Sequence, residues 1–245
     1  MKKIVFLGSK EIGLECLKYL FNNRKSLGVE IIGVLTNKRG KEIVNFCKFN
    51  NIYILKNLKE YLEIDFVDIG ISIQYHQILK KEHIDKAKEI TINLHMAPLP
   101  EYRGCNQFSY AIINKDTEFG TTIHRLEEGI DSGAILFEKR FKIPPKSWVE
   151  DLFKLTLKKS IELFREHIDD IIKANYTLKP QSDYIKSRGT SLHYRKEIDE
   201  LKRIDLSWPK EKIERHIRAT YMPGFEPPYS FINGEKIYFS HDYKK

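Results

Sequence analysis

The residues best suited to chemistry begin with an asparagine and a histidine two positions apart. Asn93 and His95 stand at the end of the apolar run ITINLH, which predicts a strand over 90–95. Residues two apart on a strand point to the same face, so the amide and the imidazole should emerge side by side. In an open α/β sheet, ligands bind at the carboxyl ends of the strands. A solvated strand end would explain the same pair without any chemistry.

A carboxylate follows 36 residues after the histidine, in the loop EEGIDSG. This residue, Asp131, has a glycine on either side within the loop. A carboxylate beside an imidazole orients the ring and stabilises its protonated form, and an amide N–H can donate to a developing oxyanion. No obvious serine or cysteine nucleophile accompanies the three groups. The set therefore suits acyl transfer in which the substrate brings its own nucleophile.

A second candidate ligand site is the turn GSKEIG after the first predicted strand. Backbone N–H groups at the start of a helix can meet an anion, and Ser9 and Lys10 lie in this turn. The segment lacks the third glycine of a dinucleotide fingerprint and the Gly-Lys-Ser/Thr of a P-loop. A tight strand-to-helix turn explains it equally well.

The elements that must position these residues alternate between apolar runs and amphipathic stretches. This alternation predicts βα units around a parallel sheet. Strands are expected over 3–7, 29–36, 52–55, 66–73 and 90–95, and helices over 12–27, 40–50 and 105–113. Next come a hairpin-like strand pair over 120–126 and 134–143 and a long amphipathic helix over 149–174. A polar stretch near 180 predicts a domain boundary, followed by a helix near 209–221 and a hairpin around Asn233-Gly234.

Composition limits the class of protein. The chain has 245 residues, of which 41% are hydrophobic and 31% charged, as in a globular protein with a conventional core. No apolar run approaches the roughly 20 residues of a membrane span, and the apolar start is too short for a signal peptide, so we expect a cytoplasmic protein with no membrane partner. The three cysteines form no CxxC pair, which predicts neither a disulfide framework nor a metal site.

The net charge of +8 is spread evenly along the chain. Residues 1–150 carry 23 Lys and Arg against 19 Asp and Glu, and residues 151–245 carry 19 against 15. A solvated mixed-charge surface therefore fits better than a nucleic-acid-binding face, so we expect no nucleic-acid partner. A small anionic ligand remains compatible with this distribution.

The motifs NLHMAPLPEYRG and GTTIHRLEEGIDSGAIL, in this order, resemble those of the folate-dependent formyltransferase family. The segment QYHQILKKEH is similar to the family's border of the folate site, and the tail pattern IRATYMPG also matches. The resemblance covers about residues 1–180. It implies a Rossmann-like α/β fold with a mostly parallel sheet. It also implies transfer of a formyl group from 10-formyltetrahydrofolate to a primary amine, and we expect no metal because no cluster of residues has ligand spacing.

The resemblance also implies roles for individual residues. His95 would accept a proton from the attacking amine, Asn93 would bind the formyl oxygen, and Asp131 would orient His95. The folate would contact Gln77, Ile78 and Leu79 and the later loop at Leu126 and Gly129. The other histidines, His124 among them, match no role and are expected to be surface or structural residues.

Chain length separates the branches of this family. A glycinamide ribonucleotide formyltransferase would end soon after the long helix, and a methionyl-tRNA formyltransferase would carry a longer C-terminal barrel and a basic face. The region 181–245 looks more like the short tail of sugar nucleotide N-formyltransferases. These enzymes act on amino sugars attached to a nucleoside diphosphate, often dTDP, for bacterial surface polysaccharides such as O-antigen. A noncatalytic ligand-binding protein on the same scaffold is the alternative of another class.

A sugar nucleotide would need few contacts. Ser9, Lys10 and Arg103 are candidates to bind its pyrophosphate, and Tyr221 and Phe225 could stack on the base or pack the hairpin onto the catalytic domain. We expect residues 1–180 to form the catalytic domain. A lone two-stranded hairpin is marginal in water, so we expect residues 181–245 to serve subunit pairing in a homodimer.

Overall fold

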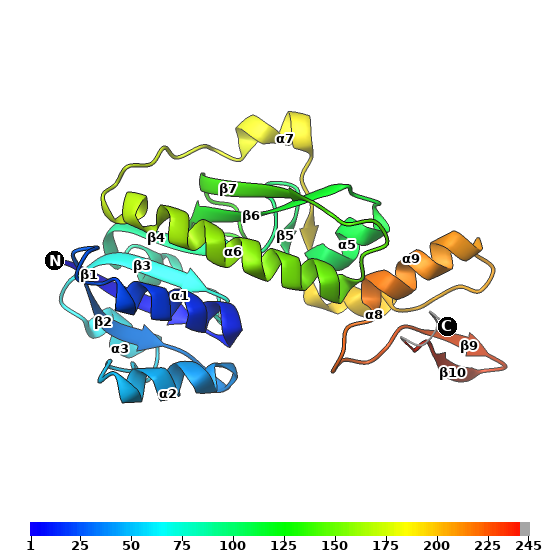
Figure 1. Ribbon diagram of the computed structural model, residues 1–245, viewed down its shortest axis with the longest axis horizontal. Coiled ribbons are helices and arrows are strands. Elements are labelled where there is room, and N and C mark those ends of the chain that lie inside the picture. Colours follow the sequence, from blue (N-terminus) through cyan, green and yellow to red (C-terminus); the bar gives the residue numbers. More distant parts are fainter. Residues whose placement is uncertain (241–245) are drawn as a thin grey trace.

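The computed structural model describes residues 1–240, and its centre is a six-stranded sheet with the order β2-β1-β3-β4-β6-β7 (Figure 1). β1 (Lys2–Gly8), β2 (Val29–Leu35), β3 (Val67–Ile73) and β4 (Ala87–His95) run parallel to one another. β6 (Glu118–Arg125) pairs antiparallel with β4, and β7 (Ile135–Lys142) pairs antiparallel with β6. The expected α/β fold with a mostly parallel sheet is confirmed.

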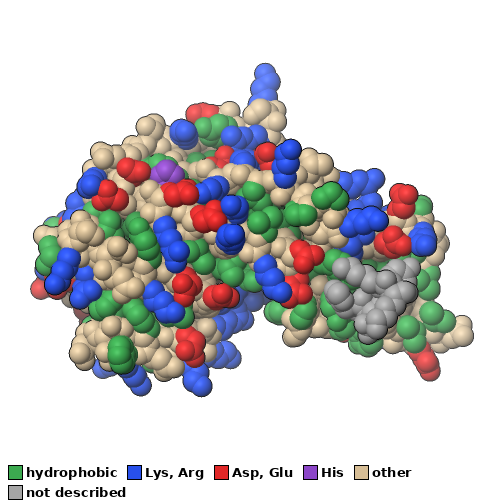
Figure 2. Space-filling model, in the orientation of Figure 1, with side chains coloured by type: hydrophobic (Ala, Val, Ile, Leu, Met, Phe, Trp, Pro, Cys, Tyr) green, Lys and Arg blue, Asp and Glu red, His purple; other side chains and the backbone are tan. Residues whose placement is uncertain are grey.

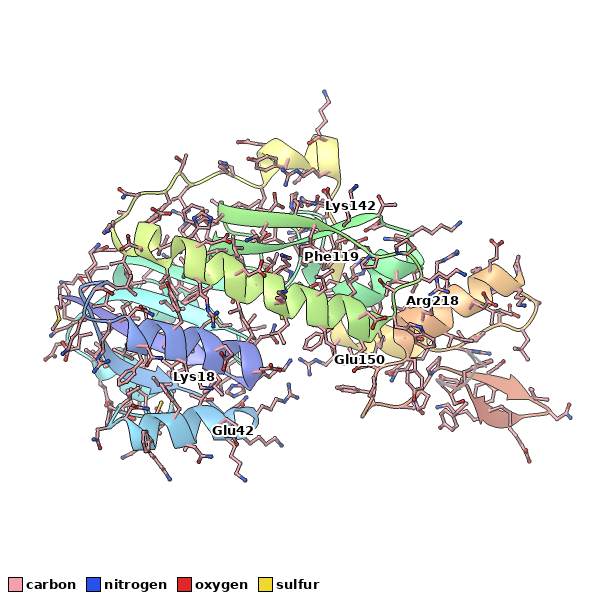
Figure 3. All side chains as sticks on the ribbon, viewed as in Figure 1. Lys18, Glu42, Phe119, Lys142, Glu150 and Arg218 are labelled. Carbon is pink, nitrogen blue, oxygen red and sulfur yellow. The ribbon has the colours of Figure 1, made fainter. Side chains whose placement is uncertain are left out.

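Both faces of this sheet are covered, because the central strands carry apolar side chains on both faces. Ile4 and Phe6 of β1 pack in a core with α1 (Lys10–Asn22), α2 (Lys41–Phe49) and α6 (Val149–Ile172). Val5 and Leu7 point the other way and pack in a core that includes α3 (Leu58–Glu63) and the end of α4 (Lys81–Ile84). Neighbouring strand residues face opposite sides, so such a strand requires helices on both faces. Figure 3 shows α6 lying across Phe119 of β6, which is fully buried.

Several boundaries differ from the sequence expectations. The helix expected over 12–27 ends at Asn22, and turns occupy the rest. The strand expected over 52–55 is a single bridge between Ile54 and Val34, so that prediction is wrong. The short helices α3, α4, α7 (Ser182–Arg188) and α8 (Ile198–Leu201) and the 3-10 turn η1 (Lys38–Gly40) were not indicated by the sequence.

After α6 the chain returns along the edge of the sheet. Lys179 forms an antiparallel bridge with Ile135, α7 follows, and β8 (Leu192–His193) pairs with β5 (Arg103–Gly104) beside the end of β4. The 3-10 turn η2 (Arg195–Glu197) then leads through α8 to α9 (Lys210–Thr220), which packs against α5 (Gln107–Ile113). The chain past residue 180 therefore lies against the part of the molecule that contains the central sheet.

The expected C-terminal hairpin is present. β9 (Tyr229–Ile232) and β10 (Glu235–Tyr238) pair antiparallel around Asn233-Gly234, and Figure 1 shows them at the lower right, next to α9. Within residues 1–240, no helix combines the length and the apolar character needed to cross a membrane.

Candidate active site

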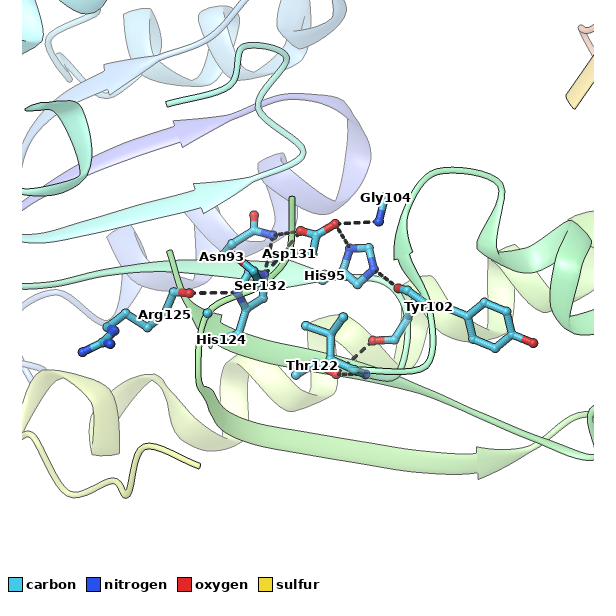
Figure 4. A network of polar contacts seen from close by, with 12 residues as sticks. Asn93, His95, Tyr102, Gly104, Thr122, His124, Arg125, Asp131 and Ser132 are labelled. Atoms are coloured by element: carbon cyan, nitrogen blue, oxygen red, sulfur yellow. Dashed lines mark hydrogen bonds and ion pairs between the residues drawn. The ribbon is translucent and has the colours of Figure 1, made fainter. Parts of the chain in front are cut away.

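The carboxyl end of β4 places Asn93 and His95 on one face, as their spacing predicts. The antiparallel register of β6 sets His124 opposite Asn93 and Thr122 opposite His95. Thr122 donates its hydroxyl to the carbonyl of Ala97 at 2.9 Å, which ties the loop after β4 to β6. Strand pairing thus brings an amide and two imidazoles together (Figure 4).

The loop between β6 and β7 carries Asp131 to the same place. Its Oδ2 lies 3.5 Å from His95 Nδ1 and accepts the backbone N–H of Gly104 at 3.0 Å. Its Oδ1 lies 3.4 Å from Asn93 Nδ2 and 3.5 Å from His124 Nε2. The structure therefore brings Asn93, His95 and Asp131 into one cluster, in which one carboxylate contacts every member.

The environment of Asp131 sets its charge. Burial of the side chain disfavours the ionised form and by itself raises the pKa, but several groups act in the opposite direction. The imidazoles of His95 and His124 in their protonated forms, together with the N–H of Gly104, hold the pKa of Asp131 well below its usual range. Asp131 is consequently a carboxylate at neutral pH, and its negative charge faces the two rings.

Hydrogen bonds to backbone carbonyls determine which ring nitrogens carry protons. His95 Nε2 lies 2.8 Å from the carbonyl of Tyr102, so Nε2 carries the hydrogen and Nδ1, facing Asp131, is the nitrogen that can accept one. His124 Nδ1 lies 2.9 Å from the carbonyl of Arg125, so its Nε2 accepts from Asn93 Nδ2 at 3.1 Å. The second amide hydrogen of Asn93 makes only the long contact with Asp131, which leaves it available for a ligand oxygen.

His124 is the member of the cluster that sequence reasoning missed. It is fully buried between Asn93 and Asp131, so it is a structural histidine of the site and not a surface residue. The sequence predicts a strand over GTTIHRL, but it does not show that this strand pairs with the one that carries Asn93. The register of β6 against β4 is the signal that would have placed His124 beside Asn93.

Residues expected to contact folate lie around two neighbouring cavities of about 610 and 750 Å³. Ile78, Leu79 and Gly129 line the larger cavity, and Leu126 lines the smaller. Lys81, Asp85 and Glu128 line both, which makes the cavities adjacent. Gln77 accepts the hydroxyl of Tyr75 at 3.0 Å. The segment after β3 and the loop before Asp131 thus both line these cavities.

Residues 2–168 match the family model described as formyl transferase, a stretch that includes the whole cluster. The chain belongs to this family. The formyltransferase resemblance of the sequence is thereby confirmed, and the chain is an enzyme of formyl transfer.

Relatives of this formyl transferase fall into two groups. GDP-perosamine N-formyltransferase of Brucella melitensis biotype 1 is 29% identical over 224 residues, which cover 87% of this chain and 83% of the relative. Methionyl-tRNA formyltransferase of Clostridium tetani is 31% identical over 199 residues, which cover 75% of this chain but 63% of the relative. The crystal structure of the Helicobacter canadensis N-formyltransferase in complex with folinic acid and dTDP-3-aminofucose is 25% identical, with a TM-score of 0.80, covering 97% of this chain and 86% of that one.

The formyl transferase also gathers cations near the start of α1. Lys10 Nζ donates to Gln74 Oε1 at 2.9 Å. The Lys10 side chain is exposed as a whole, yet desolvation of its ammonium lowers its pKa, and the nearby guanidinium groups of Arg39 and Arg195 lower it further. Arg195 follows β8 in the C-terminal region, so a segment past residue 180 adds a cation beside Lys10. Neither arginine was singled out from the sequence.

The other expected substrate residues differ in their surroundings. Ser9 is buried and its hydroxyl donates to the carbonyl of Gln74, so it links β1 to the end of β3. Arg103 is half-buried in β5, and its Nε makes no hydrogen bond within residues 1–240. Tyr221 lies edge-on to Trp148 with ring centroids 5.9 Å apart, in an apolar cluster with Ile204. Tyr221 therefore packs against other side chains of the protein, as one of its two expected roles requires.

Two remaining sequence expectations concern exposure and metals. Phe225 is 70% exposed, so the packing expected of it is not formed among residues 1–240. Cys16 and Cys47 are buried, whereas Cys105 is half-buried beside β8. In the part of the chain that the structure describes, no group of three or more His, Cys, Asp and Glu side chains is arranged to hold a metal ion.

Proposed function

We propose that this formyl transferase moves a formyl group from 10-formyltetrahydrofolate to the primary amine of a nucleotide-linked amino sugar. One observation carries the chemistry: the Asp131 carboxylate contacts both the Asn93 amide and the His95 imidazole at the end of β4. Such a set supplies an oxyanion donor, a base and an orienting charge, which direct attack by an amine requires.

The folate, when bound, supplies the formyl group and the leaving nitrogen N10. His95 accepts at Nδ1 the proton that the amine loses as its nitrogen bonds to the formyl carbon. Asn93 donates its second amide hydrogen to the oxygen that receives the carbonyl electron pair. Asp131 stabilises the imidazolium until His95 returns the proton to N10, as the bond from carbon to N10 breaks. The products are a formamide and tetrahydrofolate.

The acceptor class is supported by two features. The GDP-perosamine enzyme of Brucella and the Helicobacter structure in complex with dTDP-3-aminofucose are similar to this chain over 83% and 86% of their own lengths. Lys10, Arg39 and Arg195 supply a compact set of cations suited to a pyrophosphate. The face shown in Figure 2 mixes both signs of charge, without the broad basic area that tRNA binding would use.

The finer proposal is that the acceptor is dTDP-4-amino-4,6-dideoxyglucose or a close isomer, used for bacterial surface polysaccharide. We also propose that the enzyme works in the cytoplasm, where folate and nucleotide sugars are made. Residues 1–180 would carry the catalytic machinery, and residues 181–245 would complete the site and pair two subunits.

The test is a panel of acceptors incubated with purified enzyme and 10-formyltetrahydrofolate, followed by mass spectrometry. The proposal expects one carbonyl unit added to a dTDP-linked 4-amino or 3-amino sugar, while methionyl-tRNA and glycinamide ribonucleotide stay unmodified. Rapid formylation of either of the last two alone would place the enzyme in another branch. Folate and nucleotide binding without any product would favour a noncatalytic protein.

A further inference from the structure

The loop that carries Asp131 follows a path that needs support from outside the loop. Asp131 has a φ of +47°, in the left-handed region that residues with a Cβ rarely adopt. Gly129 has a φ of +117°, and a Cβ added at Gly133 would collide with the carbonyl oxygen of Arg125. Such backbones persist only where surrounding groups hold them.

That support comes from Gln181, beyond the end of α6. Its Nε2 lies 2.7 Å from the carbonyl oxygen of Asp131 and 2.8 Å from that of Gly133, so both amide hydrogens are donated to the loop. The side chain is 8% exposed. Two residues earlier, Lys179 exchanges a pair of backbone hydrogen bonds with Ile135, each 2.9 Å long, which anchors the segment from which Gln181 reaches.

We propose that Gln181 is a positioning residue for formyl transfer, which holds the Asp131 backbone so that its carboxylate stays against His95. The proposal rests on the proposed function for its catalytic meaning. The Gln181 amide contacts the main chain of Asp131, while the side chain of Asp131 contacts His95, so the effect passes through one residue. An uncharged NH₂ group suits this place because it offers two donors, whereas an ionised glutamate offers none.

The first test compares Gln181→Met with Thr220→Ala. The methionine keeps the length of the side chain and removes both donors. Thr220 is also buried in the C-terminal region, and its hydroxyl donates to the carbonyl of His216 at 2.7 Å, so its loss controls for a missing buried hydrogen bond. We expect Gln181→Met to lower kcat by roughly 10- to 100-fold, with KM for the nucleotide sugar changed by less than about 3-fold. Thr220→Ala should retain its kcat.

The second test asks whether the effect passes through Asp131. In the Asp131→Asn background, adding Gln181→Met should lower kcat by no more than about 2-fold further, because the carboxylate that Gln181 positions is already absent. Losses that multiply across the two sites would overturn the proposal. Gln181→His, which keeps one donor, should lie between wild type and Gln181→Met, and it replaces the methionine variant if that one does not fold.

A third measurement does not depend on turnover. The ¹⁵N chemical shifts of the His95 ring, assigned by comparison with His95→Gln, should differ between wild type and Gln181→Met at one fixed pH, because the carboxylate moves away from the ring. Unchanged shifts with normal kcat would overturn the positioning role while leaving the proposed function intact. Changed shifts in Gln181→Met, together with a wild-type protein that formylates no acceptor, would overturn the proposed function while leaving the positioning of Asp131 intact.

Discussion

His95 and Asp131 meet through one ring nitrogen and one carboxylate oxygen 3.5 Å apart, with the other ring nitrogen bonded to Tyr102. If Nδ1 accepts the proton of the amine, His95→Ala should lower kcat by about 10²- to 10⁴-fold. The affinity for the nucleotide sugar should change little, because the proposed phosphate contacts lie elsewhere. Steady-state kinetics and equilibrium binding of the nucleotide check the two expectations.

His167→Ala is the matched control for that substitution. His167 lies on α6, where it stacks on Phe137 and faces Asp170, and so it should be replaced without loss of kcat. Near-normal turnover of His95→Ala would contradict the role of His95 as base.

Asp131 gives a prediction for the pH dependence of the reaction. Its pKa is depressed, so it stays ionised above about pH 4, and the acidic limb of the rate profile reflects protonation of the imidazole base. Asp131→Asn removes the negative charge that stabilises the imidazolium, so the base stays unprotonated to lower pH. The acidic limb should therefore shift to lower pH, with a reduced maximal rate. A reduced rate with an unmoved limb would assign Asp131 to shaping the loop alone.

The site was predictable from the sequence only where local geometry decides it. The two-residue spacing of Asn93 and His95 sufficed to place them on one face of a strand. Asp131 needed the family motif, since no local rule brings a loop 36 residues later to that strand end. His124 and Gln181 depend on long-range contacts, which neither periodicity nor composition encodes.

At the scale of elements, the pairing of β8 with β5 joins the C-terminal region to the Asp131 carboxylate. Gly104 donates its N–H to Asp131 and has a φ of +84°, and an added Cβ would collide with the carbonyl oxygen of His193. Gly104→Ala should therefore cost about 2–3 kcal/mol of unfolding free energy and much of the activity.

Gly28→Ala is a control that measures the cost of a left-handed backbone conformation without a steric collision of the added Cβ. Gly28 has a φ of +66°, but a Cβ there would meet nothing within 4 Å, so only the left-handed penalty of about 1–2 kcal/mol applies. Urea unfolding and kcat should rank Gly104→Ala as the more damaging of the two. Equal stabilities with full activity in both would show that β8 does not need its close approach to β5.

The central sheet was predictable because its strands are apolar runs that alternate along the chain with helical segments. The elements that escaped prediction are short. α3, α4, α7 and α8 span four to seven residues each, too few to display a helical period. β5 and β8 contain two residues each and exist only because tertiary packing brings them together.

At the scale of the whole molecule, the C-terminal hairpin exposes apolar side chains within a single chain. The large exposed residues there are Phe225, Phe231, Ile232, Ile237 and Tyr238. Exposed apolar side chains of this kind favour an interaction surface, and we propose pairing with a second copy. Phe231→Ser should shift the enzyme toward monomer at micromolar concentration, as measured by analytical ultracentrifugation. Phe49→Ser, at an exposed phenylalanine on α2, should leave the association unchanged. A wild-type monomer would contradict the pairing.

Transfer of an isotopically labelled formyl group tests the central claim most directly. The enzyme would receive 10-formyltetrahydrofolate labelled with ¹³C in the formyl group, together with equal concentrations of a dTDP-linked 4-amino sugar and methionyl-tRNA. The account predicts a ¹³C formamide signal on the sugar nitrogen with wild-type enzyme, and loss of that signal on the same timescale with His95→Ala. Label on the methionyl-tRNA alone, or undiminished transfer by His95→Ala, would contradict it.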